Sequence, residues 1–131
     1  MTVGLLVIAH DKIGTSLVDT AIATVGSCPL KVESLEVFKD SNADDVLDKA
    51  QKLVNTLNDG DGVLILTDLY GSTPCNITTK LKTDNNLIII TGLNLPMLMR
   101  TFNYHSLNIA ELAEKALDGG KNGILICDQV P

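Results

Sequence analysis

The amino-acid sequence predicts an α/β fold of three layers, with a mainly parallel central sheet between helices on both faces. Apolar runs of strand length alternate with amphipathic helical patterns along the whole chain. Most of the apolar runs are continuous, which is typical of parallel strands that are covered on both faces. Strands that alternate with helices in this way are joined by right-handed crossovers.

Five segments are predicted strands. They are residues 3–9, 30–35, 63–66, 87–90 and 123–127. The first is an unbroken apolar run, whereas the second alternates between apolar and polar side chains. The last, Gly123–Cys127, follows a helical pattern so closely before the end of the sequence that we expect it at an edge of the sheet, antiparallel to its neighbour or paired with another subunit. Cys127 is then expected to be a small, buried apolar side chain.

Five segments between these strands are predicted helices. They are residues 15–26, 42–58 and 74–82, a segment that has Pro96 in its first turn, and residues 109–117. The clearest is 42–58, where apolar residues repeat at the helical period. Ser41 or Asn42 is expected to cap its start, and Gly60 to close its end. The pair Gly119-Gly120 is expected to stop the last helix.

The composition excludes several classes of protein. The chain has 131 residues and a formal charge of −6, which argues against binding to nucleic acid or to anionic membranes. Its three cysteines are too few and too scattered for a disulfide framework or a zinc site. No apolar run approaches the roughly 20 residues that span a bilayer. We therefore expect one cytoplasmic domain over residues 1–131, without a metal.

Polar residues follow three of the predicted strands. His10 comes directly after the first apolar run, Asp68 follows the strand at 63–66, and Thr91–Asn94 follows the strand at 87–90. Because the carboxyl ends of parallel strands share one edge, where open α/β sheets bind ligands, we expect these residues to meet there. His10 is the first candidate for chemistry.

The loop after Asp68 has the features of an anion site. In the segment Gly71–Pro74, Thr73 is a natural helix cap and Pro74 a natural first helical residue. Backbone N–H groups at such a helix start bind phosphate. A carboxylate of Asp68 that accepts from one nitrogen of His10 fixes the tautomer and leaves the other nitrogen as a nucleophile. The pattern therefore predicts a phosphoryl acceptor.

Other interpretations of these residues are weaker. Alone, a histidine after a strand is often a satisfied loop residue, and Asp68 alone is more often a helix cap. The loop lacks the lysine of a nucleotide-binding P-loop, and the chain has no G-x-S-x-G elbow of a serine hydrolase. Asp11 and Asp68 are too few companions of His10 for a metal site. The second histidine, His105, is expected in an exposed loop.

Taken together and in order, three segments resemble the mannose-type IIA components of the bacterial phosphoenolpyruvate-dependent sugar phosphotransferase system. These segments are Val7–His10, Thr67–Asn76 and Thr91–Leu98. The resemblance extends over essentially the whole chain. Two positions of the loop depart from the family pattern: Ser72 replaces a second glycine, and Cys75 replaces an aromatic residue.

The resemblance implies a mechanism without a metal or an organic cofactor. His10 would accept a phosphoryl group from the histidine phosphocarrier protein HPr and pass it to a IIB component, which phosphorylates sugar that enters through a IIC/IID permease. Asp68 would orient the imidazole. The phosphoryl oxygens would be held by Gly71, Ser72 and Thr73.

The resemblance also implies a homodimer in which Gly123–Cys127 is exchanged between subunits. Three alternatives stay open. Two are relatives: the phosphotransfer subunit of dihydroxyacetone kinase, and a regulatory IIA protein without a transport role. The third is a module that binds a small ligand at the same edge and never carries phosphate. The choice of sugar would lie with the permease and not with this chain.

Overall fold

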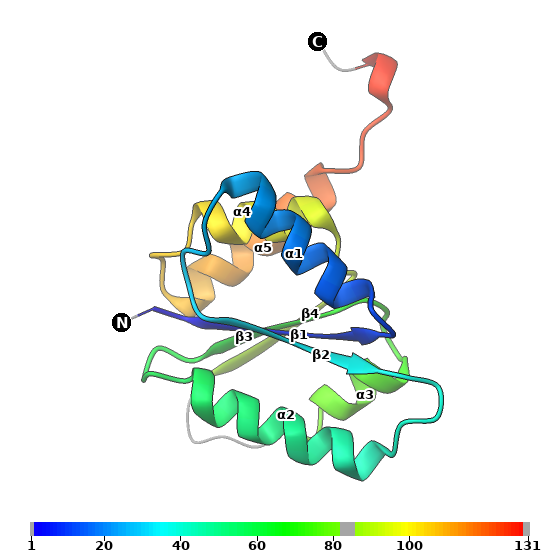
Figure 1. Ribbon diagram of the computed structural model, residues 1–131. Coiled ribbons are helices and arrows are strands. Elements are labelled where there is room, and N and C mark those ends of the chain that lie inside the picture. Colours follow the sequence, from blue (N-terminus) through cyan, green and yellow to red (C-terminus); the bar gives the residue numbers. More distant parts are fainter. Residues whose placement is uncertain (1, 82–85, 130–131) are drawn as a thin grey trace.

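The computed structural model describes residues 2–81 and 86–129 and has three layers (Figure 1). Four parallel strands form the sheet in the order β2-β1-β3-β4. The strands are β1 (Gly4–His10), β2 (Val32–Val37), β3 (Val63–Thr67) and β4 (Leu87–Thr91). The helices are α1 (Ile13–Val25), α2 (Ala43–Leu57), α3 (Thr73–Thr78), α4 (Leu95–Asn103) and α5 (Ile109–Asn122), with a short 3₁₀ helix, η1 (Cys127–Gln129). The predicted α/β fold class is confirmed.

Strand β1 lies in the middle of the sheet. It pairs with β2 on one side and with β3 on the other, so that Ile8 stands opposite Leu35 and Thr67. Leu6, Val7 and Ile8 are each 0% exposed. Because successive side chains of a strand point to opposite faces, this burial requires cover on both faces of the sheet. Burial on both faces explains why the sequence of β1 is continuously apolar up to His10.

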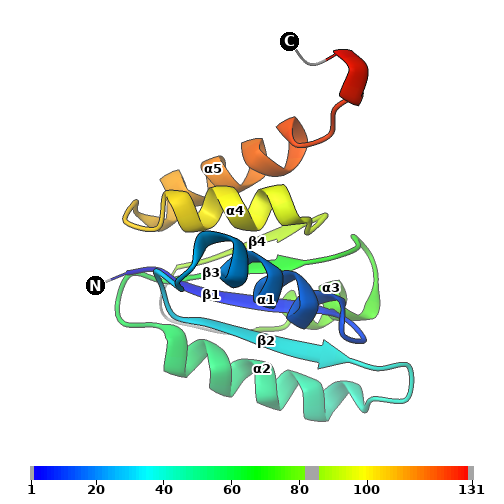
Figure 2. The same cartoon turned by 45° about the horizontal axis from the view of Figure 1, so that its top comes forward.

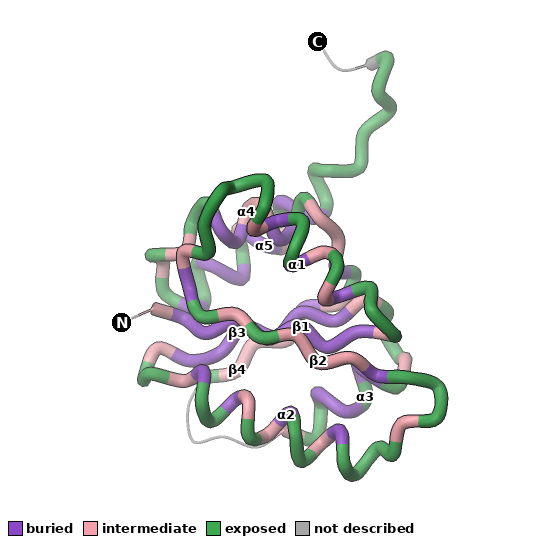
Figure 3. The backbone as a smooth tube through the Cα atoms, viewed as in Figure 1, coloured by how far each residue is buried: buried purple, intermediate pink, exposed green. Residues whose placement is uncertain are grey.

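Helices cover both faces of the sheet (Figures 1 and 3), and each face has its own apolar core. One face packs against α1, α4 and α5, through Val18, Ala21, Leu98, Phe102, Leu112 and Ala116. The other packs against α2 and α3, through Val46, Ala50, Val54 and Ile77. Side chains from alternate positions of β1 and β3 enter each core. None of the described helices is long and apolar enough to cross a membrane.

Helix α2 is capped by asparagine at both ends. The Asn42 side chain accepts a hydrogen bond from the Asp45 N–H at 3.1 Å, so Asn42, and not Ser41, is the N-cap. The helix ends at Asn58 rather than at Gly60. The Gly60 N–H donates to the Asn58 side chain at 2.9 Å in the turn that follows.

Other boundaries differ from the prediction by a few residues. Helix α1 begins at Ile13, and its C-cap Gly26 has a φ of 94° as a left-handed cap requires. Strand β2 lies two residues later than predicted, at Val32–Val37. Helix α3 ends at Thr78, earlier than the predicted end at residue 82, which lies outside the described residues.

The prediction that Gly119-Gly120 stops the last helix is wrong, since α5 continues to Asn122. Both glycines are buried against α4. A Cβ atom at Gly119 would collide with the Arg100 side chain and would lie 3.2 Å from the Pro96 carbonyl oxygen. The glycines therefore allow close packing of two helices instead of ending one.

The predicted strand at Gly123–Cys127 is not formed within the described chain, and its pairing with another subunit stays a prediction. Beyond α5 the chain leaves the body of the molecule (Figure 2), and Ile124, Leu125 and Ile126 are 79%, 66% and 63% exposed. Cys127 is exposed rather than buried and begins the 3₁₀ helix. A strand requires a neighbouring strand for its backbone hydrogen bonds, and this segment has none within the described chain.

The α4–α5 contact predicts different effects for the two glycines. Gly119→Ala should lower the free energy of unfolding by about 1–3 kcal/mol, because the new methyl group meets atoms close to the backbone of α4. At Gly120 a Cβ atom would lie 2.8 Å from Met97 Cε, the movable end of a side chain. Gly120→Ala should therefore stay within about 1 kcal/mol of the wild type, since alanine also favours the helix. Urea denaturation measures both, and equal losses would contradict the packing argument.

Candidate functional site

The side chains of His10 and Asp68 meet at the carboxyl edge of the sheet. His10 ends β1, and Asp68 directly follows β3, the strand beside it. Asp68 Oδ2 accepts two hydrogen bonds from His10, from the backbone N–H at 3.1 Å and from ring Nδ1 at 2.8 Å. Because an ionised carboxylate only accepts, the Nδ1 atom carries the proton. Nε2 has no hydrogen-bond partner among the described residues, and in the neutral form of the ring it has the lone pair.

The two side chains of this pair differ in their access to solvent. The Asp68 side chain is 13% exposed, whereas that of His10 is 44% exposed. Partial burial on its own would raise the pKa of the Asp68 carboxyl group. The hydrogen bonds from the His10 ring and backbone, with the attraction of the ring, outweigh this effect and hold the pKa of Asp68 below its usual value. The carboxylate is therefore a fixed anion behind an accessible ring.

His10 borders a cavity of about 540 Å³. The other residues that line it are Asp11, Val37, Phe38, Lys39, Ser41 and Thr73. Apart from His10 and Val37, which end β1 and β2, they come from the segments that follow β1, β2 and β3. Lys39, Ser41 and Thr73 supply an ammonium group and two hydroxyl groups, which are hydrogen-bond donors for an anion.

Only part of the predicted anion-binding loop, Gly71–Pro74, lines this cavity. Thr73 lines it, but Gly71 and Ser72 do not. The Ser72 hydroxyl donates to the Leu69 carbonyl at 2.6 Å, and the Ser72 N–H donates to the same oxygen at 3.3 Å. Ser72 has a φ of −78°, so serine fits without strain where the family pattern has a second glycine. Gly71, with a φ of 77°, is the position that favours glycine.

Asn76 stabilises this loop, a role that was not predicted. Its side-chain amide donates to the Gly71 carbonyl at 3.4 Å, and its backbone N–H donates to the Ser72 carbonyl at 2.8 Å. A polar residue inside the first turn of a short helix was the available signal. Asn76 thereby fixes the chain on which Thr73 lies.

Lys39, Ser41 and Phe38 were also missed by sequence reasoning. They follow β2, which lies beside β1 in the sheet and brings its loop to the His10 side of the edge. The sequence shows that β2 is a strand but does not show on which side of β1 it lies. The order of the strands was the missing information.

The segment Thr91–Asn94 was expected at the same edge but does not line the His10 cavity. It begins at the last residue of β4, which is separated from β1 by β3. The Leu93 N–H donates to the Thr67 carbonyl at 3.0 Å, next to Asp68. The Asn94 side chain caps α4 by accepting from the Met97 N–H at 2.9 Å. The segment therefore supports the end of β3, next to Asp68, and the start of α4.

His105 lies away from this site, in the connection between α4 and α5, and it is half-buried rather than exposed. Its neighbour Ser106 lines a cavity with Gly60 and Asn86, which precede β3 and β4 and so mark the amino edge of the sheet. Over residues 2–81 and 86–129, no group of three or more His, Cys, Asp or Glu side chains is placed to hold a metal ion.

Residues 4–117 match the sequence pattern of the protein family described as "PTS system fructose IIA component", where PTS denotes the phosphotransferase system. The chain belongs to this family. The mannose-specific EIIAB component of the PTS from Escherichia coli strain K12 is 26% identical to this IIA chain over 127 residues, which are 95% of the chain and 39% of that relative. The IIA chain therefore spans less than half the length of this curated relative.

Solved structures agree with this assignment. The PTS IIA protein associated with the fucose utilization operon of Streptococcus pneumoniae is 26% identical, with a TM-score of 0.77 over 96% of this chain and 93% of that one. The phosphotransferase system component EIIA from Streptococcus agalactiae has a TM-score of 0.87 at 24% identity, over 98% and 99% of the two chains, which is a likeness of fold. The predicted resemblance to mannose-type IIA components is confirmed.

The low pKa of Asp68 predicts how pH changes the stability of this IIA chain. Asp68→Asn should lower the free energy of unfolding by about 1–3 kcal/mol at neutral pH, because hydrogen bonds to a charged group are lost. Because the pKa of Asp68 is lower in the folded state, its ionised carboxylate stabilises the fold at pH values above the unfolded-state pKa of about 3.9. This contribution disappears as the pH falls through the folded-state pKa. The difference between wild type and variant should therefore vanish in strong acid.

Urea denaturation of both proteins at several pH values between neutrality and strong acid measures this difference. Asp48→Asn is the matched control, because Asp48 is exposed on α2 and has no ion-pair or hydrogen-bond partner among the described residues. A loss of stability in Asp68→Asn that stays constant at every pH would contradict the assignment of the hydrogen bonds to a charged carboxylate.

Proposed function

We propose that the chain is a phosphoryl carrier that takes a phosphoryl group from HPr onto His10 Nε2 and passes it to a IIB component for sugar uptake and phosphorylation. One observation carries this proposal. The Asp68 carboxylate accepts a hydrogen bond from His10 Nδ1 at 2.8 Å, while Nε2 has no hydrogen-bond partner in the described part of the chain and the ring borders an open cavity. Membership of the IIA family supports it.

The proposed transfer requires no separate acid or base. The lone pair of Nε2 attacks the phosphorus atom, the bond between phosphorus and the donor breaks, and the bonding electrons leave with the donor atom. The ring gains positive character as the new bond forms, and the Asp68 carboxylate stabilises it through the Nδ1–H. In the second transfer, the nucleophile of the acceptor attacks phosphorus and the electrons of the P–N bond return to Nε2.

The phosphoryl oxygens require donors that do not hold the group too firmly. Lys39, Ser41 and Thr73 border the cavity beside His10, and we assign them this role. Gly71 and Ser72 shape the loop that carries Thr73. A carrier transfers the group twice, so binding the phosphorylated ground state more tightly than the transition state would slow the second transfer.

Phosphorylation by purified partners tests the proposal. The wild-type chain, incubated with enzyme I, HPr and phosphoenolpyruvate, should gain one acid-labile phosphoryl group by mass spectrometry. His10→Ala should gain none, and His105→Ala should behave as the wild type because His105 lies near the other edge of the sheet. The proposal fails if the wild type gains no phosphoryl group, or if the gain persists in His10→Ala.

The role of Asp68 is tested by the rate of the same reaction. Asp68→Asn should slow transfer about ten- to a hundredfold, because a hydrogen bond to a charged group contributes about 1.5–3 kcal/mol. Circular dichroism checks that the variant is folded. An unchanged transfer rate in the folded variant would remove Asp68 from the mechanism.

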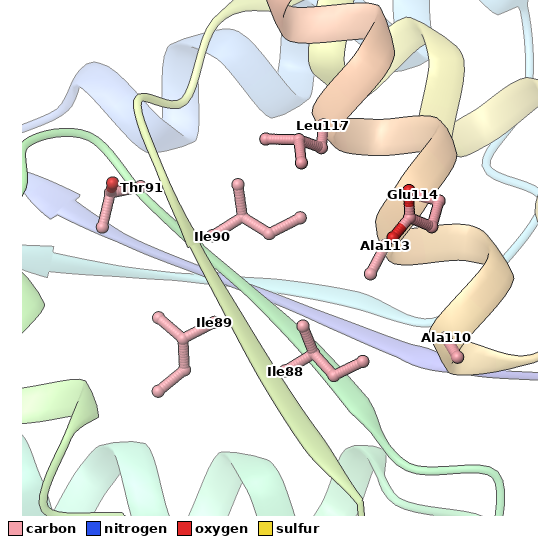
Figure 4. A pocket seen from close by; sticks show the side chains of 8 residues that line it. All are labelled: Ile88, Ile89, Ile90, Thr91, Ala110, Ala113, Glu114 and Leu117. Carbon is pink, nitrogen blue, oxygen red and sulfur yellow. The ribbon is translucent and has the colours of Figure 1, made fainter.

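We also propose that two chains form a dimer by exchanging the segment after α5. Ile124, Leu125 and Ile126 are exposed, and β4 is an edge strand of the described sheet. A groove of about 460 Å³ lies between β4 and α5, with apolar side chains that include Ile88 and Leu117 (Figure 4). Pairing of the segment with β4 of a second chain would bury apolar surface from both.

Light scattering after gel filtration measures this association. The wild type should be a dimer, and the double variant Leu125→Glu, Ile126→Glu should be a folded monomer, because charged side chains oppose burial in an apolar groove. Asp128→Asn, in the same segment, is the control for a change outside the apolar triplet. A monomeric wild type, or a double variant that remains dimeric, would contradict the exchange.

A further inference from the structure

The residue after His10 has an unusual backbone conformation. Asp11 has a φ of 49°, and it is the one non-glycine residue with a positive φ in the described part of the chain. This region costs an ordinary residue about 1 kcal/mol, and glycine occupies it without that cost. The Asp11 N–H donates to the Val37 carbonyl at 2.8 Å, so the conformation is fixed by the neighbouring strand β2.

The backbone geometry does not explain why this residue has a carboxylate. The side chain of Asp11 has no hydrogen-bond or ion-pair partner among the described residues. It does not cap α1 either, since the N-cap is Lys12 and no side chain caps the first turn. Glycine would fit this backbone better and asparagine about equally well.

The position of Asp11 supplies an explanation, because it lines the same cavity as His10. We propose that the negative charge of Asp11 sets the transfer potential of the phosphorylated His10, an inference that rests on the proposed function. A phosphoryl group carries close to two negative charges at neutral pH. Asp11 repels this group on Nε2, and Lys39 of the same cavity attracts it. The opposed charges prevent phosphorylated His10 from becoming so stable that the second transfer is slow.

The expected size of the effect follows from the exposure of the groups. Asp11 and Lys39 are exposed, so water and salt weaken their interaction with the phosphoryl group. A repulsion between exposed charges a few ångströms apart changes an equilibrium constant about two- to fivefold. Asp11 therefore adjusts the balance between the loaded and the free carrier, while His10 and Asp68 perform the transfer.

Asp11→Asn tests the proposal, because asparagine keeps the shape and tolerates the left-handed backbone. The equilibrium constant for phosphorylation by HPr should rise about two- to fivefold, and the rate of transfer to the acceptor should fall. The rise should shrink at about 1 M salt, where the Debye length is about 3 Å. Asp11→Gly should raise the equilibrium constant by the same factor as Asp11→Asn. Different factors in the two variants would indicate an effect of backbone conformation instead of charge.

Asp19→Asn is the matched control, since Asp19 is exposed on α1, does not line the cavity, and lies six residues, or about 9 Å, beyond the start of the helix. It should leave the equilibrium constant unchanged. A slower transfer from HPr in Asp11→Asn with an unchanged equilibrium constant would make Asp11 a contact for the partner and would overturn the proposal.

A second measurement does not depend on any partner. The affinity for inorganic phosphate, followed by the NMR signals of the His10 ring, should be about two- to fivefold higher in Asp11→Asn than in the wild type. A wild type that takes no phosphoryl group from HPr would overturn the proposed function, and the phosphate affinities would then decide the role of Asp11. Equal phosphate affinities and equal equilibrium constants in wild type and variant would overturn the role assigned to Asp11.

Discussion

The burial of β1 on both faces is the constraint on which the rest of the structure depends. The strand pairs with β2 and β3 and sends alternate side chains into two different cores, so helices must cover the sheet above and below. Helix α1 covers β1 closely at Gly14, where a Cβ atom would lie 2.7 Å from Val7 Cγ1. The strand ends at His10, and the site therefore lies at the end of a strand that is buried on both faces.

The site combines a rigid, shielded side with an open one. Asp68 is held by two hydrogen bonds from His10, and Leu93 supports the strand that carries it. The ring also borders a cavity in which Asp11 and Lys39 carry opposite charges. Such a division suits a group that must be held in one orientation and yet be reached by two partners in turn. The fixed side is set by the neighbouring strands β1 and β3, whereas the open side includes the exposed side chains of Asp11 and Lys39.

The sequence predicted those parts that depend on local pattern. β1 and β3 were recognised from continuous apolar runs, and the meeting of His10 with Asp68 follows once two parallel strands are neighbours. Lys39 was missed because the strand order 2-1-3-4 is a long-range property. Gly119 and Gly120 were misinterpreted because a glycine that ends a helix and one that allows close packing look alike in a sequence. Ile124–Ile126 has the composition of a strand, but a strand requires a partner that local pattern does not specify.

The location of His10 at the end of β1 has a consequence for the interpretation of variants. The same seven-residue strand supplies side chains to both cores and carries the proposed reacting ring. A destabilising substitution at Leu6, Val7 or Ile8 lowers the amount of folded protein and the activity together, even though every proposed reacting group is still encoded. In a survey that scores only activity, these positions would be indistinguishable from His10 itself. Loss of function along this strand therefore identifies chemistry only where the abundance of folded protein is measured in the same cells.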